Sequence, residues 1–169
     1  LHGHETAEQC LWIRERVACT IRAFPAGDRA ISRFARFGAD YLLVDGQSPG
    51  SGQVFDWRLA EGVVDPGRMF VSGGLTPENV GDAIAALRPR GVDVSSGVEA
   101  APGTKDPQRL RAFIKNARSA AAQEAAASAA QLADIVGQGG DVGGVVEGSA
   151  GGRCDGAAGE RAPYDWMER

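Results

Sequence analysis

The chain has 169 residues, 43% of them apolar, and its 18 Lys and Arg against 22 Asp and Glu give a net charge of −4. This composition is typical of one ordinary folded domain rather than of a charged, disordered chain. Because no run of Lys or Arg exceeds two residues, we expect neither nucleic acid nor an anionic membrane as partner, whereas a small anion fits. The absence of a membrane-length apolar stretch and of C-x-x-C spacing favours a cytoplasmic protein.

Composition changes near Arg118. Residues 1–118 combine apolar periodicity with charges and turn signals, whereas residues 119–169 are mostly Ala and Gly. The Ala-rich part, 119–136, has high helix propensity and is predicted to extend the preceding helix. Ten glycines lie between 137 and 159, so ordering that segment would cost much conformational entropy, and 137–169 is predicted to be a flexible tail or linker.

Short apolar runs alternate with amphipathic segments in the first region. The runs predict strands at 18–24, 41–45, 69–72 and 92–95. Helical spacing of apolar residues predicts helices at 5–16, 28–37, 77–87 and 106–118, and Pro near the start of the last two is typical of a helix N-terminus. This order of strand, loop and helix indicates an α/β fold with parallel strands, either an open sheet or a barrel.

Two glycine-rich corners follow the last two predicted strands, at 72–79 (SGGLTPEN) and 95–99 (SSGVE). Small residues at a strand end let backbone N–H groups approach an anion closely. In a (β/α)₈ barrel, a phosphate site commonly lies in the loops after the seventh and eighth strands. Tight turns alone would also explain one such corner, but two in succession favour a phosphate site.

Acidic and imidazole side chains are the candidates for chemistry. Asp45 ends a predicted strand, so its carboxylate should emerge at the mouth of the sheet, where barrel enzymes keep their reactive groups. Asp93 faces either this mouth or the core, where it would be a hydrogen-bonded buried carboxylate. The H-x-H spacing of His2 and His4 suits a metal, but no further ligands cluster nearby, so we expect no metal site.

The ordered motifs of residues 1–118 resemble phosphoribosylanthranilate isomerase. The most discriminating one is the ending GVDVSSGVE followed by PGTKDP. The motifs that carry the resemblance are Leu1 to Gly3 (LHG), Leu42 to Asp45 (LLVD), Gly50 to Trp57 (GSGQVFDW), Ser72 to Val80 (SGGLTPENV), Gly91 to Glu99 (GVDVSSGVE) and Pro102 to Asp106 (PGTKD).

The resemblance implies the last four β/α units of a TIM (β/α)₈ barrel at 1–118, with the N-terminal strands missing. It also implies an Amadori rearrangement in tryptophan biosynthesis, from N-(5-phosphoribosyl)anthranilate to 1-(2-carboxyphenylamino)-1-deoxyribulose 5-phosphate, without a cofactor. Asp45 then matches the general acid, and we expect it in a partly dehydrated mouth. The phosphosugar would be held by the backbone of Gly73, Gly74, Ser96 and Gly97, with His2 and Asp93 as further pocket residues.

The sequence departs from the family pattern in two places. The family's general base is a Cys on the first barrel strand, followed by Gly, and an Arg follows the second strand; neither motif is present here. We therefore expect the chain alone to be inactive. The alternatives are an inactive remnant, a linker-bearing module of a fusion with other tryptophan-pathway enzymes, or another phosphate-binding barrel enzyme.

Overall fold

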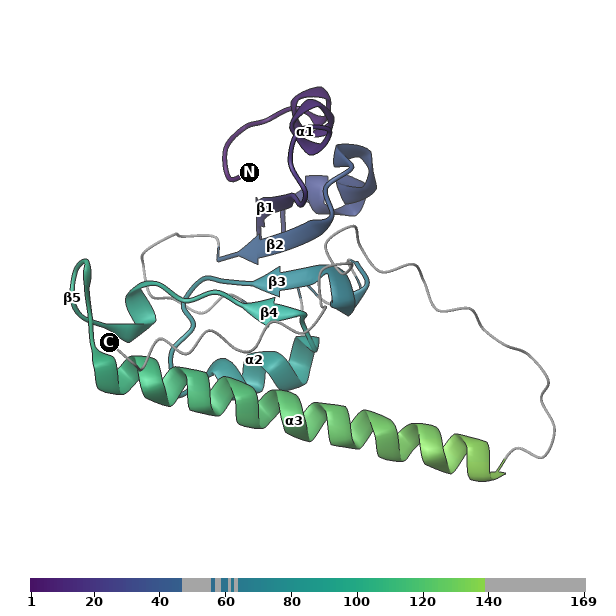
Figure 1. Cartoon of the computed structure of the whole chain (residues 1–169), viewed down its shortest axis with the longest axis vertical. Coiled ribbons are helices and arrows are strands. Elements are labelled where there is room, and N and C mark those ends of the chain that lie inside the picture. The colour runs from purple at the N-terminus through teal and green to yellow at the C-terminus, as the bar shows by residue number, and fades with distance from the viewer. Residues whose placement is uncertain (47–55, 57–58, 61, 63, 139–169) are drawn as a thin grey trace.

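A parallel sheet of four strands organises the chain (Figure 1). The computed structural model describes residues 1–46, 56, 59–60, 62 and 64–138. The strands β1 (Ile21–Pro25), β2 (Tyr41–Asp45), β3 (Met69–Val71) and β4 (Gly91–Val92) lie side by side in chain order. All three pairings are parallel, as predicted. The α/β class with parallel strands is therefore confirmed. The sheet is open in the described residues, so they form no closed barrel.

Leu1 extends the sheet beyond β1. Its terminal amine donates to the Ile21 carbonyl at 2.8 Å, and its own carbonyl accepts from the Ala23 N–H at 2.8 Å. These are the bonds of a parallel neighbour, which places Leu1 where a preceding strand would end. Leu1 thus lies beside β1 at the edge of the four-stranded sheet.

Helices connect the strands, and some differ from their predicted limits. The helix α1 (Ala7–Arg14) is shorter than predicted because Thr6 and Gln9 form a capping box that starts it later. Residues Arg29–Phe37 form η1, a 3₁₀ helix rather than an α-helix, and α2 (Val80–Leu87) starts one turn after Pro77. The helix α3 (Pro107–Gln138) begins with the Asp106 carboxylate accepting from two backbone N–H groups and continues through the Ala-rich segment.

Smaller elements complete the connections. The 3₁₀ turn η3 (Pro66–Arg68) leads into β3, and η4 (Ser96–Val98) follows β4, which is shorter than predicted. A hairpin of β5 (Glu99–Ala101) and β6 (Thr104–Lys105) precedes α3. The loop after Gly46, most of the motif at 50–57 and the segment 139–169 lie outside the described residues.

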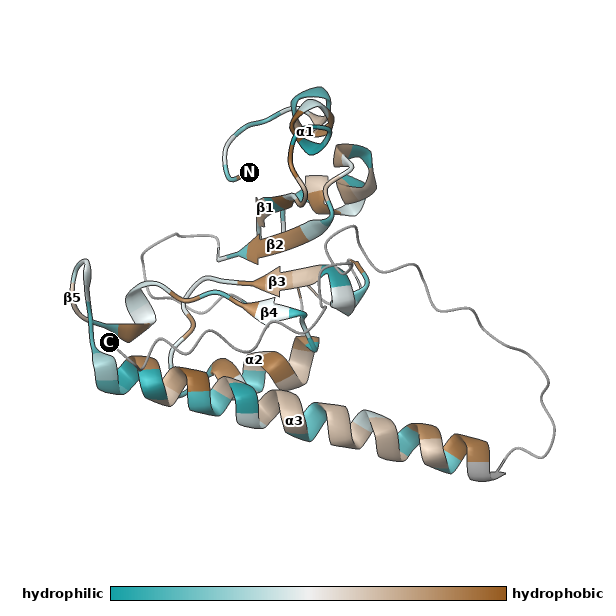
Figure 2. Cartoon of the chain, in the orientation of Figure 1, coloured by the Kyte–Doolittle hydropathy of each residue, from teal (hydrophilic) through white to brown (hydrophobic). Residues whose placement is uncertain are grey.

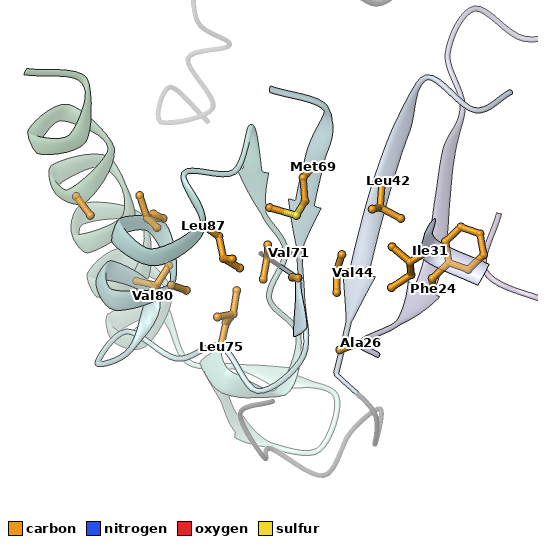
Figure 3. Close-up of a cluster of buried hydrophobic side chains, with 14 of the residues drawn as sticks. Phe24, Ala26, Ile31, Leu42, Val44, Met69, Val71, Leu75, Val80 and Leu87 are labelled. Carbon is orange, nitrogen blue, oxygen red and sulfur yellow. The ribbon is translucent and has the colours of Figure 1, made fainter. Parts of the chain in front are cut away.

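The core lies between the sheet and its helices (Figure 3). Alternate residues of β2 and β3, including Leu42, Val44 and Val71, are fully buried on this face. Leu75, Val80 and Leu87 meet them from the loop and helix that follow β3. The other face is the one that would face a barrel interior, and it is lined by Leu1, Ile21, Ala23, Leu43, Phe70 and Val92 around a cavity of about 410 Å³.

Apolar side chains are exposed chiefly at two places. Leu11, Trp12, Val17 and Ile21 around α1 and β1 are each at least 39% exposed. The last turns of α3 carry exposed Leu132, Ile135 and Val136, which appear brown at the far end of the helix in Figure 2. None of the helices in the described part of the chain combines the length and apolarity needed to cross a bilayer.

Candidate functional site

The carboxyl ends of β2, β3 and β4 converge on one cavity of about 290 Å³. Parallel strands bring their carboxyl ends to the same edge of a sheet, so residues far apart in sequence meet there. The cavity brings together the seven residues predicted to form the substrate site: His2, Asp45, Gly73, Gly74, Asp93, Ser96 and Gly97.

The Asp45 carboxylate is held at the wall of this cavity. Its Oδ1 accepts from the Ser72 hydroxyl at 2.7 Å and from the Gly46 N–H at 2.9 Å. Its side chain is only 13% exposed, as expected for a partly dehydrated mouth, and Oδ2 lies 3.3 Å from Nε2 of His2. One oxygen is therefore fixed by hydrogen bonds, and the other lies beside the imidazole.

Two glycines are required by close backbone approach. A Cβ on Gly73 would lie 2.2 Å from the Gly46 nitrogen, and its φ of +88° is in the left-handed region. A Cβ on Gly97 would lie 1.7 Å from the Leu75 carbonyl oxygen. The two glycine-rich corners are thus packed against each other, with no room for a side chain at either contact.

Backbone N–H groups at these corners are available to a ligand. Within the described residues, the N–H groups of Gly73, Gly74, Ser96 and Gly97 make no hydrogen bond. Unpaired N–H groups beside a cavity favour an anion, because they can satisfy several of its oxygens at once. Four N–H groups without a protein partner in the described part of the chain thus belong to residues that line the cavity.

His2 and Asp93 both line the cavity and are both exposed. The His2 imidazole is 64% exposed, and its contact in the described residues is with Asp45. Asp93 is exposed at the cavity rim, so its alternative as a buried core carboxylate is wrong. The described residues contain no group of His, Cys, Asp and Glu that could hold a metal ion.

The sequence did not predict several contacts that hold the site residues in place. Ser72 holds Asp45, and the Asn79 amide donates to the Gly74 carbonyl at 2.9 Å. Lys105 donates to the Ser95 carbonyl at 2.8 Å and to Glu99 at 3.0 Å, which lowers the pKa of the Glu99 carboxyl. Ser72 could have been found as the residue that follows β3 beside Asp45, but the lysine contact depends on the hairpin, which carried no clear strand signal.

Comparison with known proteins decides the family. Residues 1–116 match the family model described as N-(5'-phosphoribosyl)anthranilate (PRA) isomerase. The chain belongs to the phosphoribosylanthranilate isomerase family. The resemblance read from the motifs is therefore confirmed, and an isomerase of Desulforudis audaxviator is 47% identical over 126 residues, which are 70% of this chain and 60% of that protein.

Other family members match this chain over a similar share of its length. The isomerase of Thermotoga maritima is 44% identical over 122 residues, again 70% of this chain and 60% of the relative. The crystal structure from Thermus thermophilus superimposes with a TM-score of 0.62 at 38% identity, covering 70% of this chain and 59% of that one. A family structure in complex with reduced 1-(o-carboxyphenylamino)-1-deoxyribulose 5-phosphate has a TM-score of 0.58 at 40% identity, covering 70% and 58%. The chain thus spans about 60% of the length of the curated relatives it matches.

Proposed function

We propose that the chain carries the general acid and the phosphate-binding part of a phosphoribosylanthranilate isomerase site. The observation that supports this most strongly is the shared cavity, whose lining includes Asp45 and four residues with unpaired backbone N–H groups. A solved relative binds a reduced form of the reaction product, a phosphosugar. The reaction would be the Amadori rearrangement of N-(5'-phosphoribosyl)anthranilate to 1-(2-carboxyphenylamino)-1-deoxyribulose 5-phosphate.

In this proposal the phosphate anchors the substrate. Gly73 and Gly74 would donate from one corner, and Ser96 and Gly97 from the other, to the phosphate oxygens. Fixing the charged end restricts the sugar to a few orientations, which reduces the entropic part of the barrier. The furanose ring would then extend toward Asp45.

Asp45 would act as the general acid. Ser72 and Gly46 occupy Oδ1, which leaves Oδ2 to carry the proton. Protonation of the furanose ring oxygen breaks the ring C–O bond and gives an open-chain Schiff base. Loss of the C2′ proton to a base then gives an enolamine, which tautomerises to the ketone. His2, beside Oδ2, would help return the proton to Asp45.

The second proton transfer lacks the family's base, a Cys on the first barrel strand. The sequence lacks the strand Cys-Gly motif of the family, and no acid or imidazole other than Asp45, His2 and Asp93 lines the cavity in the described residues. We therefore propose that the chain turns over substrate negligibly by itself. Strands supplied on the β1 side would restore the base and complete the site.

The loss of phosphoribosylanthranilate fluorescence tests this proposal directly. Purified chain is expected to show negligible turnover. Addition of the N-terminal segment of the Thermotoga maritima isomerase is expected to give turnover that Asp45→Asn abolishes. Robust turnover by the chain alone, lost in Asp45→Asn, would show that another base operates. Complemented turnover that survives Asp45→Asn would contradict the acid role.

Binding of inorganic phosphate separates the anchoring role from the chemistry. Titration followed by amide resonances is expected to shift the N–H signals of Gly73, Gly74, Ser96 and Gly97 in the isolated chain. Asp45→Asn should leave these shifts in place, because the carboxylate is not among the proposed phosphate donors. Phosphate shifts confined to other parts of the chain would contradict the assignment of the two corners.

A further inference from the structure

Arg22 lies on β1 and does not line the mouth cavity, yet it contacts the segment that carries His2. We propose that Arg22 is a positioning residue of the site. It fixes residues Leu1 to Glu5 so that the His2 imidazole stays beside the Asp45 carboxylate. This inference rests on the proposed function, in which His2 and Asp45 act together.

The contacts of Arg22 surround His2 in the sequence. Its Nη1 donates to the Leu1 carbonyl at 3.2 Å, and its Nη2 donates to the Gly3 carbonyl at 2.9 Å. These two carbonyls belong to the residues directly before and after His2. The guanidinium group thus holds the peptide unit directly before His2 and the unit between Gly3 and His4. The unit directly after His2 is held through its Gly3 N–H, which donates to Glu5.

Glu5 completes this arrangement. Its Oε2 lies 2.9 Å from Nη1 of Arg22 and accepts from the Gly3 N–H at 3.0 Å. Hydrogen bonds from its own backbone N–H and from Gly3, together with the Arg22 charge, lower the pKa of the Glu5 carboxyl. Glu5 is therefore a carboxylate at neutral pH and compensates the buried guanidinium charge.

Arg22 itself is held rigidly enough to serve as an anchor. It is 5% exposed, and its guanidinium carbon lies 4.9 Å from the centre of the Phe24 ring and 5.7 Å from that of Phe37. The two rings meet edge to face at 5.1 Å. Stacking on aromatic faces and a planar fork of donors restrict an arginine more than a lysine in the same place.

The position of His2 depends on this anchor because its side chain has little other support. The imidazole is 64% exposed, so packing does not restrict it. Apart from the contacts of Arg22 and Glu5, the segment is fixed by the two ladder bonds of Leu1 to β1, which act before His2 in the chain. If the Leu1 bonds alone kept His2 beside Asp45, Arg22 would stabilise the fold without positioning His2.

Histidine NMR distinguishes the two roles without any turnover. The chain has two histidines, so the Cε1–H resonance of His2 is assigned by its loss in His2→Gln. At one fixed pH, Asp45→Asn is expected to shift this resonance in the otherwise wild-type chain. We expect Arg22→Met to reduce that Asp45-dependent shift to less than half, and Arg22→Lys to restore part of it.

Arg68→Met is the matched control. Arg68 also donates to two backbone carbonyls, of Ala39 and Asp40, and lies 5.3 Å from the Phe34 ring centre, but it is at the opposite end of the strands. The Arg68→Met substitution should leave the Asp45-dependent shift of the His2 resonance at full size. An equal reduction in Arg68→Met would show a general loss of structure and overturn the proposal.

The remaining outcomes are decisive as well. A full Asp45-dependent shift in folded Arg22→Met, or no shift of His2 in the wild-type chain on Asp45→Asn, would overturn it. If Arg22→Met does not fold, Arg22→Lys and Glu5→Gln replace it, and an undiminished shift in both would overturn it. Failure of the proposed function would appear separately, as complemented turnover that survives Asp45→Asn.

Discussion

The two ends of the sheet are built differently. At β3 and β4, the helices α2 and α3 cover the sheet, and Leu75, Val80 and Val98 are at most 2% exposed. At β1, α1 covers less, and Trp12 is 59% and Leu11 is 43% exposed. The first end is stabilised by apolar burial, whereas at the second the buried Phe24, Ile31 and Phe34 are joined by polar contacts of Arg22 with backbone carbonyls.

The candidate site lies where these two ends meet. The anion-binding corners belong to the well-packed end, and their backbone approaches so closely that side chains are excluded. His2 belongs to the other end and reaches Asp45 from an exposed segment. We infer that phosphate binding tolerates a missing neighbour on the β1 side, whereas the chemistry at Asp45 does not.

The largest effect is expected from Gly97→Ala. The new Cβ would lie 1.7 Å from the Leu75 carbonyl oxygen, a backbone atom that cannot turn away. One corner must shift, so phosphate binding should be lost, with destabilisation of more than about 3 kcal/mol. Isothermal titration with inorganic phosphate and urea unfolding measure the two effects.

Gly81→Ala is the control for this substitution. A Cβ there would lie 3.9 Å from that of Ala120, an ordinary contact, and Gly81 is inside α2. Alanine has the higher helix propensity, so the change should stabilise the chain by up to about 1 kcal/mol. Intact phosphate binding in Gly97→Ala would show that the corners do not form the anion site.

A pair of leucine truncations compares the two ends directly. Leu75→Ala removes a side chain that is 2% exposed and should lower the free energy of unfolding by about 2–3 kcal/mol. Leu11→Ala removes one that is 43% exposed and should cost less than about 1 kcal/mol. Urea unfolding of both variants is the measurement. Equal losses would contradict the difference in packing between the two ends.

The sequence predicted the strands and the mouth of the sheet because both follow from local patterns. Short apolar runs located β1 to β3, and Asp45 and the glycine corners follow directly from strand ends. The 3₁₀ form of η1 and the early end of β4 carry no such pattern. The contacts of Arg22 join residues 17 to 21 positions apart, so they depend on how the chain returns past β1.

Ser72→Ala should have a smaller effect that is confined to the site. It removes the hydroxyl that donates to Asp45 Oδ1 at 2.7 Å and leaves that buried oxygen with the Gly46 N–H. Loss of a hydrogen bond to a charged group costs about 1.5–3 kcal/mol. Urea unfolding measures the loss, and complemented turnover should fall while phosphate binding persists.

Ser32→Ala provides the matched control for Ser72. The Ser32 hydroxyl donates to the Arg29 carbonyl within η1, on the exposed surface. Its removal should change the free energy of unfolding by less than about 0.5 kcal/mol. An effect of Ser72→Ala no larger than this would show that Ser72 does not hold the carboxylate.

The smallest effect is expected in the pH dependence of Glu5→Gln. Because the pKa of Glu5 is lowered in the folded chain by its backbone hydrogen bonds and Arg22, its ionised form stabilises the fold. That contribution is complete above the ordinary glutamate pKa of about 4.3 and is lost as the pH falls through the lower, folded value. Glu5→Gln should therefore be less stable than wild type at neutral pH and equal to it in acid. Urea midpoints at both pH values measure this, and a difference that stays constant into the acid range would show that the Glu5 charge does not hold Arg22.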